Sequence, residues 1–96
     1  MKAQLLYRTK SVLSDGAILE MVIWKILQPL LGSLHNYKYS LFYGYPGQRV
    51  IGYDNERGKG DHRHIRGHEE AYGFSTIEKL IDDFLRDVNV RRQRRR

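Results

Sequence analysis

The chain of 96 residues contains no cysteine. Disulfide bonds, thiolate metal sites and cysteine nucleophiles are therefore excluded, and any chemistry must come from histidine, arginine, lysine, tyrosine and carboxylate side chains. The length suffices for one domain but not for two stable cores. Hydrophobic residues make up 41% of the chain, so we expect a modest core in a protein that folds alone or as a small homo-oligomer.

Long uninterrupted apolar segments are also lacking. The most apolar stretch, residues 17–34, is broken by Glu20, Lys25 and Pro29 and does not resemble a membrane span. The first ten residues carry Arg8 and Lys10 within their apolar part, unlike the hydrophobic region of a signal peptide. We therefore expect no membrane association and a cytoplasmic location.

Positive charge is concentrated at one end of the chain. There are 17 basic and 11 acidic residues, for a net charge of +6. Five of the basic residues fall within the last six positions: Arg91, Arg92, Arg94, Arg95 and Arg96. We expect a single domain over residues 1–90 and an arginine-rich tail over residues 91–96. Such a tail binds nucleic acid through counterion release, binds an acidic partner, or is simply solvated.

Four segments have the composition of strands. Residues 3–13 and 17–27 are rich in strand-forming side chains and are separated by the turn sequence Ser14-Asp15-Gly16, which predicts a hairpin. Residues 37–45 alternate tyrosine with other residues, and Pro46-Gly47 favours a type II turn into a strand over residues 49–54. We expect a four-stranded, mainly antiparallel meander, with the tyrosines either packed beneath a helix or free to stack on bases.

One amphipathic helix is predicted at the end of the domain. Ser75 and Glu78 have the spacing of a capping box, and the apolar residues that follow recur at helical spacing up to about Val90. The predicted apolar face consists of Ile77, Leu80, Ile81, Phe84 and Val88. The fold class is therefore α+β, with Trp24 and Phe84 expected to be buried where the helix meets the second strand.

A polar segment, residues 55–73, lies between the last predicted strand and the helix, and we expect it to be a long loop. It holds three of the four histidines. Histidine exchanges protons near neutral pH, and cationic side chains stabilise charge developing on phosphate, which suits metal-free RNA cleavage by the RNA's own 2′-hydroxyl. The predicted catalytic residues are Glu56, Arg57, Lys59, Asp61, His62 and His64. Predicted RNA contacts are Tyr53, Arg63 and Arg66, together with the tail arginines.

Two other interpretations of this segment stay open. In an extended segment His62 and His64 point the same way and would hold a metal together with Asp61, His68 or Glu69, although Arg63 and Arg66 would repel a cation. The segment would otherwise be a solvated loop whose charges pair with one another.

Several strings resemble the TumE family of toxins, over about residues 2–90. They are Asp15-Gly16-Ala17, residues 20–24, Tyr37-Lys38-Tyr39 and, most specifically, residues 52–64. The resemblance implies the toxin half of a type II toxin–antitoxin module, with a protein antitoxin that resembles helix-turn-helix DNA-binding proteins.

From the residues and the resemblance together we predict a toxin that acts on RNA as a metal-independent endoribonuclease and needs no cofactor. The alternatives are a non-catalytic module that binds nucleic acid or a partner, and a histidine-based metal-binding domain.

Overall fold

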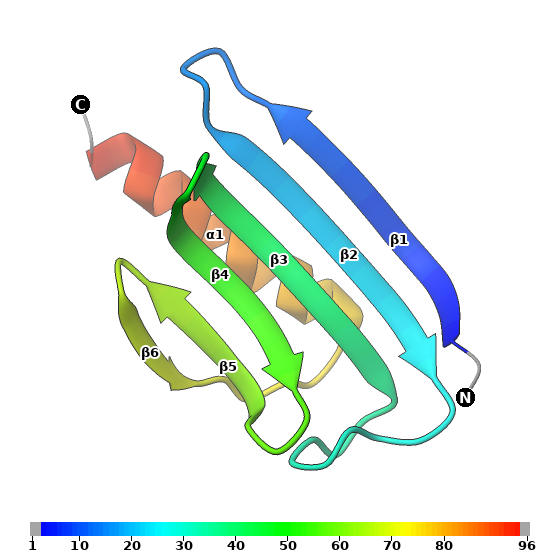
Figure 1. Cartoon of the computed structure of the whole chain (residues 1–96). Helices are drawn as coiled ribbons and strands as arrows, with labels where there is room; N and C mark the ends of the chain where they lie inside the picture. The colour runs from blue at the N-terminus through cyan, green and yellow to red at the C-terminus, as the bar shows by residue number, and fades with distance from the viewer. Residues whose placement is uncertain (1–2, 95–96) are drawn as a thin grey trace.

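The computed structural model describes residues 3–94, which form one antiparallel sheet and one helix (Figure 1). The sheet has six strands, and their spatial order repeats their order along the chain, β1-β2-β3-β4-β5-β6. The elements are β1 (Ala3–Val12), β2 (Ile18–Ile26), β3 (Tyr37–Tyr45), β4 (Gln48–Glu56), β5 (Gly60–Ile65), β6 (His68–Ala71) and α1 (Ile77–Arg94). The predicted α+β class and its C-terminal helix are confirmed.

The predicted strand count of four is wrong, because the segment predicted as a long loop folds into a further hairpin. β5 pairs with β4 from Ile51 opposite Ile65 to Glu56 opposite Gly60, and β6 then pairs with β5. Both turns use left-handed backbone, at Gly58 and Gly60 in the first and at Arg66 and Gly67 in the second. Charged side chains on both faces of this hairpin hide the alternation that normally reveals a strand.

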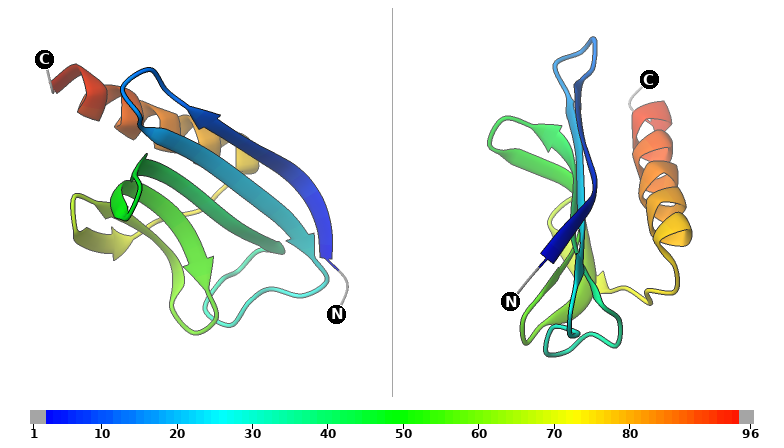
Figure 2. Two further views of the ribbon diagram at one scale, coloured as in Figure 1. Left: turned by 45° about the horizontal axis from the view of Figure 1, so that its top comes forward. Right: turned by 90° about the vertical axis from the view of Figure 1, so that its right-hand side faces the viewer.

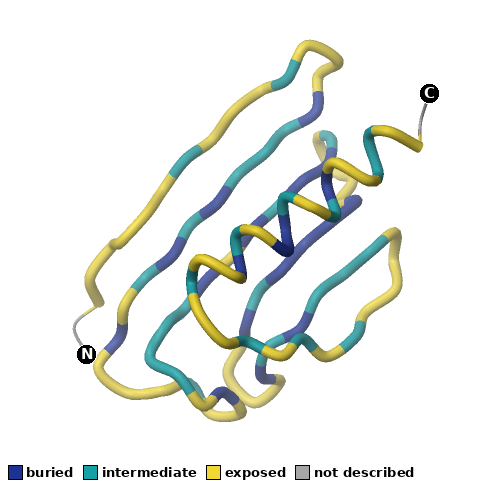
Figure 3. The backbone as a smooth tube through the Cα atoms, turned by 180° about the vertical axis from the view of Figure 1, so that it is seen from behind, coloured by how far each residue is buried: buried dark blue, intermediate teal, exposed yellow. Residues whose placement is uncertain are grey.

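The helix covers only one face of the sheet, as the right-hand view of Figure 2 shows. Beneath it lies the core, in which the largest fully buried side chains include Tyr39, Tyr43, Tyr53 and Phe84. Tyr39 and Tyr43, in the middle of residues 37–45, are therefore packed rather than available for stacking on bases, whereas Tyr37 and Tyr45 are half-buried. Figure 3 shows that buried residues follow the middle strands, whereas β1 is exposed almost throughout. We call the sheet face opposite the helix the open face.

The helix differs from its prediction at both ends. It begins at Ile77, and the backbone N–H of Lys79 donates to the hydroxyl oxygen of Thr76 at 3.1 Å, so Thr76 rather than Ser75 is the N-cap. It continues to Arg94 instead of ending near Val90. The predicted apolar face is confirmed: Leu80, Phe84 and Val88 are buried, with Ile77 and Ile81 packed beside them.

The prediction for Trp24 is wrong. Trp24 pairs with Lys38, and the neighbouring pair, Ile23 with Tyr39, supplies the residues buried under the helix. Because successive side chains of a strand point to opposite faces, Trp24 lies on the open face and is only partly buried.

Candidate functional site

Two histidines and a carboxylate meet on the open face where β4 and β5 pair. Asp54 lies opposite His62 and Gly52 lies opposite His64, and residues two apart on a strand share a face. The His62 and His64 rings are in edge contact, with centroids 5.2 Å apart. The hairpin that the sequence concealed therefore brings together the two histidines predicted to be catalytic.

His62 is held in place from both sides of its ring. It is only 3% exposed, and its Nδ1 lies 3.1 Å from the carbonyl oxygen of Gly60. Its Nε2 lies 2.6 Å from Asp54 Oδ1, a charge contact in which neither buried atom attains hydrogen-bond geometry. Asp54 was not predicted as a site residue, but its place opposite His62 makes it the carboxylate of this cluster.

His64 is the more accessible ring of the two. It is partly buried, and this burial, followed by the nearby charge of Arg49, lowers the pKa of His64 below its usual 6.5. The ring is therefore neutral at lower pH than an ordinary histidine. A neutral imidazole beside solvent can accept a proton from a bound molecule.

Two cations flank the histidines. Lys59 pairs with Glu69 at 3.1 Å, and the same Glu69 oxygen lies 3.6 Å from His62 Nε2. This contact with Glu69 raises the pKa of Lys59 and lowers that of Glu69. Glu69 thus lies between the cation and the buried histidine.

Arg49, the second cation, was missed in the sequence. Tyr43 pairs with Ile51 and Gly44 with Arg49, so Val50 is an extra residue that shifts the register. The shift turns Arg49 toward the open face, where its side chain lies over Gly52: a Cβ on that glycine would come within 2.6 Å of Arg49 Cδ. A glycine in the middle of a strand was the one signal that a long side chain crosses there.

The other predicted catalytic residues lie elsewhere. Asp61 points toward the helix side, where it accepts hydrogen bonds from the hydroxyls of Ser33 at 2.6 Å and Tyr39 at 2.7 Å and contacts His35 Nε2 at 2.6 Å. Burial and then Asp61 raise the pKa of Tyr39. This network ties the β2–β3 loop to β5. Glu56 is exposed at the end of β4, and Arg57 is exposed in the turn that follows.

Two predicted RNA contacts, Tyr53 and Arg63, lie between the sheet and the helix. Tyr53 is fully buried and donates to Asp87 at 2.5 Å, and both burial and this bond raise its pKa. Arg63 donates to Glu70 at 2.6 Å and to the Tyr53 hydroxyl at 3.0 Å. These bonds connect β4, β5, β6 and α1, so both side chains are engaged within the protein.

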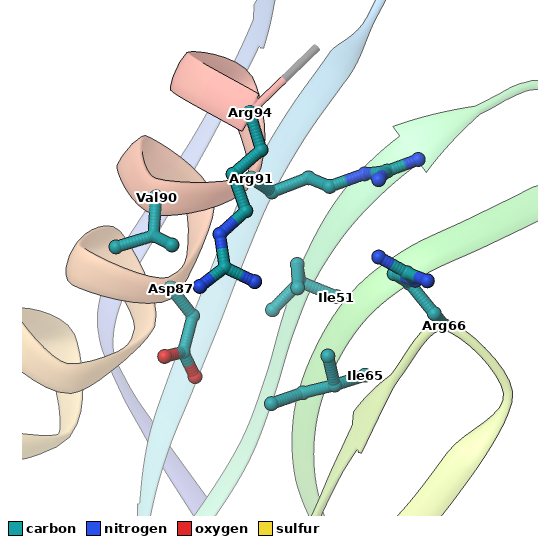
Figure 4. Close-up of a pocket in the computed structure, with 7 residues that line it drawn as sticks. All are labelled: Ile51, Ile65, Arg66, Asp87, Val90, Arg91 and Arg94. Atoms are coloured by element: carbon teal, nitrogen blue, oxygen red, sulfur yellow. The ribbon is translucent and has the colours of Figure 1, made fainter.

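Three of the five arginines predicted to form a tail lie in α1 instead. Arg92 contacts Asp15 at 3.3 Å and donates to the Tyr43 hydroxyl at 2.9 Å. Arg91 and Arg94 line a pocket with Arg66 from the β5–β6 turn (Figure 4). Arg95 and Arg96 lie outside the described residues.

Asp54, His62 and His64 can also be considered as metal ligands. Each offers one ligand atom, and these atoms lie within 4.8 Å of one another. The third ligand of such a site is Asp54 rather than Asp61 or His68, and Arg63, which we expected to repel a cation, lies on the other face. Two imidazoles and one carboxylate form a donor set suited to zinc or iron.

The fold and this site define a small α+β protein with a paired-histidine cluster on an uncovered sheet face. The chain belongs to the TumE toxin family, because the family model described as Toxin TumE matches residues 2–94. It is therefore a toxin of a toxin–antitoxin module, and its family implies an antitoxin partner. No curated protein and no solved structure matches the chain significantly.

Within residues 3–94, no helix combines the length and apolar character needed to cross a membrane.

Proposed function

We propose that this toxin acts on RNA as a metal-independent endoribonuclease, with the histidine cluster of the open face as its active site. The observation that carries the proposal is the edge contact of His62 and His64 at 5.2 Å, on a face that also presents Lys59 and Arg49. Proton-transfer groups next to cations are what phosphodiester cleavage requires.

In the proposed reaction the 2′-oxygen of a ribose attacks the adjacent phosphorus and the bond from phosphorus to the 5′-oxygen breaks. Neutral His64 takes the proton of the 2′-hydroxyl, and the 5′-oxygen leaves with a proton from His62, whose Nε2 lies 2.6 Å from Asp54 Oδ1. The products are a 2′,3′-cyclic phosphate and a 5′-hydroxyl end. No protein nucleophile and no metal enters this reaction.

Lys59 and Arg49 are proposed to stabilise the charge that develops on the phosphate. Lys59 is paired with Glu69, and Glu69 also lies 3.6 Å from His62. A phosphate that binds Lys59 competes with Glu69, and displacement of this carboxylate uncovers His62. Glu56, Arg57 and Asp61 were predicted to share in the chemistry, and we now place their contribution outside the reacting groups.

The proposal is tested by incubating purified protein with RNA, in the presence and absence of EDTA. We expect cleavage that survives EDTA and leaves cyclic phosphate ends. The His64→Ala variant should lose this activity, while His68→Ala, whose side chain is 74% exposed and lies outside the cluster, should keep it. Intact RNA with the unaltered protein would refute the proposal.

A second function rests on a different observation, the 2.6 Å approach of Asp54 Oδ1 and His62 Nε2 without hydrogen-bond geometry. A divalent metal bound by Asp54, His62 and His64 would occupy the space that these atoms face. We prefer the metal-free reaction because Arg49 and Lys59 oppose a second positive charge. Cleavage that EDTA abolishes and zinc or manganese restores would favour the metal, and RNA retention without cleavage would favour a binding module.

We further propose that the antitoxin is a helix-turn-helix protein and that the pair acts in the cytoplasm. The support is the family to which the chain belongs, together with the net charge of +6, which favours an acidic partner surface. An adjacent reading frame that encodes such a protein, and that suppresses toxicity on co-expression, is the expected result.

A further inference from the structure

A pocket of about 180 Å³ opens between the β5–β6 turn and the C-terminal end of α1. Its charged wall consists of Arg66, from the turn, and Arg91 and Arg94, from the last turns of the helix. Its apolar wall consists of Ile51, Ile65 and Val90. Figure 4 shows the three guanidinium groups around Ile51, with Ile65 below them and the Asp87 carboxylate beneath one of them.

None of the three arginines has an ion-pair partner within the described chain. Asp87 also borders the pocket, but it already accepts the Tyr53 hydroxyl and contacts Arg63. Among residues 3–94 no carboxylate lies within 4.0 Å of the charged nitrogens of Arg66, Arg91 or Arg94. Arg91 Nε is in addition a buried donor with no acceptor. An unsatisfied buried donor costs free energy that a bound anion would recover.

We propose that this pocket binds a backbone phosphate of single-stranded RNA, with the attached base against Ile51 and Ile65. The inference rests on the proposed function, in that it takes RNA as the molecule bound. Guanidinium groups match phosphate oxygens in pairs, and an apolar surface beside them suits the face of a base.

The position of the pocket favours RNA over an acidic segment of the antitoxin. Ile65 in the pocket directly follows His64 on β5, so pocket and histidine cluster lie back to back near one end of the sheet. Arg66 begins the turn between β5 and β6, where the two faces meet. An RNA strand held in the pocket passes this turn and reaches the open face, where Arg49 lies beside His64.

The test uses the His64→Ala protein as background, so that binding is measured without cleavage and is independent of the proposed chemistry. Its affinity for a single-stranded RNA of about ten nucleotides is measured at several salt concentrations. Arg66→Gln and Arg91→Gln should weaken binding, and each should flatten the slope of log K against log salt by about 0.7. Arg86→Gln removes the same charge from an exposed site on α1 outside the pocket and should leave the slope unchanged.

Two other results would overturn the inference. Equal slopes for the Arg66, Arg91 and Arg86 variants would show that the pocket holds no phosphate. Variants that keep RNA affinity but lose binding to the antitoxin would assign the pocket to that partner instead. Failure of the unaltered protein to cleave, with the arginine effects intact, would refute the proposed reaction and leave the pocket standing.

Discussion

His62, His64 and His68 lie within seven residues of one another and have three different surroundings. His62 is buried against Asp54, His64 is partly exposed beside Arg49, and His68 is exposed at the start of β6. Alternation along a strand is enough to predict that the first two share a face. Their partners were not predictable, because Asp54 belongs to another strand and Arg49 reaches the open face only through the register shift at Val50.

The surroundings predict different effects of substitution. We expect His64→Ala to reduce turnover about 10²- to 10⁴-fold, the range for a lost general base, and to abolish growth inhibition when no antitoxin is expressed. His62→Ala should also inactivate the toxin, but with a loss of stability, because it leaves the Asp54 carboxylate without its partner. Melting curves measured beside toxicity separate the two effects. A fully toxic His64→Ala variant would contradict the assignment.

The pKa of His64 predicts the pH dependence of activity. Because burial and Arg49 lower this pKa, the base stays neutral below pH 6.5, and kcat/KM should fall on acidification only at a pH below 6.5. The unfolded chain takes up this proton at higher pH than the folded one, so the contribution of His64 to stability is present above 6.5 and is lost as pH falls through the folded pKa. NMR titration should show that the pKa of His64 rises in the Arg49→Gln variant. A fall of kcat/KM that already begins above pH 6.5 would contradict the lowered pKa of His64.

At the scale of elements, the sequence predicted four strands and the helix but not the β5–β6 hairpin. β2, β3 and α1 each bury one regular set of apolar side chains, which is the pattern that sequence reveals. β5 buries only Gly60 and His62, and polar or charged side chains occupy both of its faces. The turns and the neighbouring strands direct its pairing. The pattern of residues within β5 itself does not reveal either of them.

Two aromatic residues allow the packing of the two sheet faces to be compared. Phe84 is fully buried between α1 and the sheet, so Phe84→Ala should cost about 3 to 5 kcal/mol of unfolding free energy. Trp24, partly buried on the open face, should cost clearly less on the same substitution. Denaturant unfolding of both variants checks this. Equal losses would mean that the open face is covered as tightly as the helix face.

At the scale of the whole molecule, stability is expected to decline from the middle of the sheet toward β1. The strands under the helix supply the core, whereas nine of the ten residues of β1 are exposed and its outer edge has no partner strand within the described chain. Local opening needs little free energy where few apolar contacts are lost. Amide hydrogen exchange should therefore be fastest in β1 and slowest in β3 and β4. Slow exchange throughout β1 would indicate that a second chain pairs with this edge.

The order of the strands also has a consequence for how the molecule assembles. Every strand pairs with its neighbour in sequence, so the sheet can form through successive hairpins, each closing a short loop, which favours rapid folding. The helix is different, since it must dock on strands that lie far back along the chain. Only this last step brings Arg91 and Arg94 to Arg66. A chain that has paired its strands but not docked its helix therefore carries the histidines without the arginine pocket, so the proposed RNA path would be complete only in the finished fold.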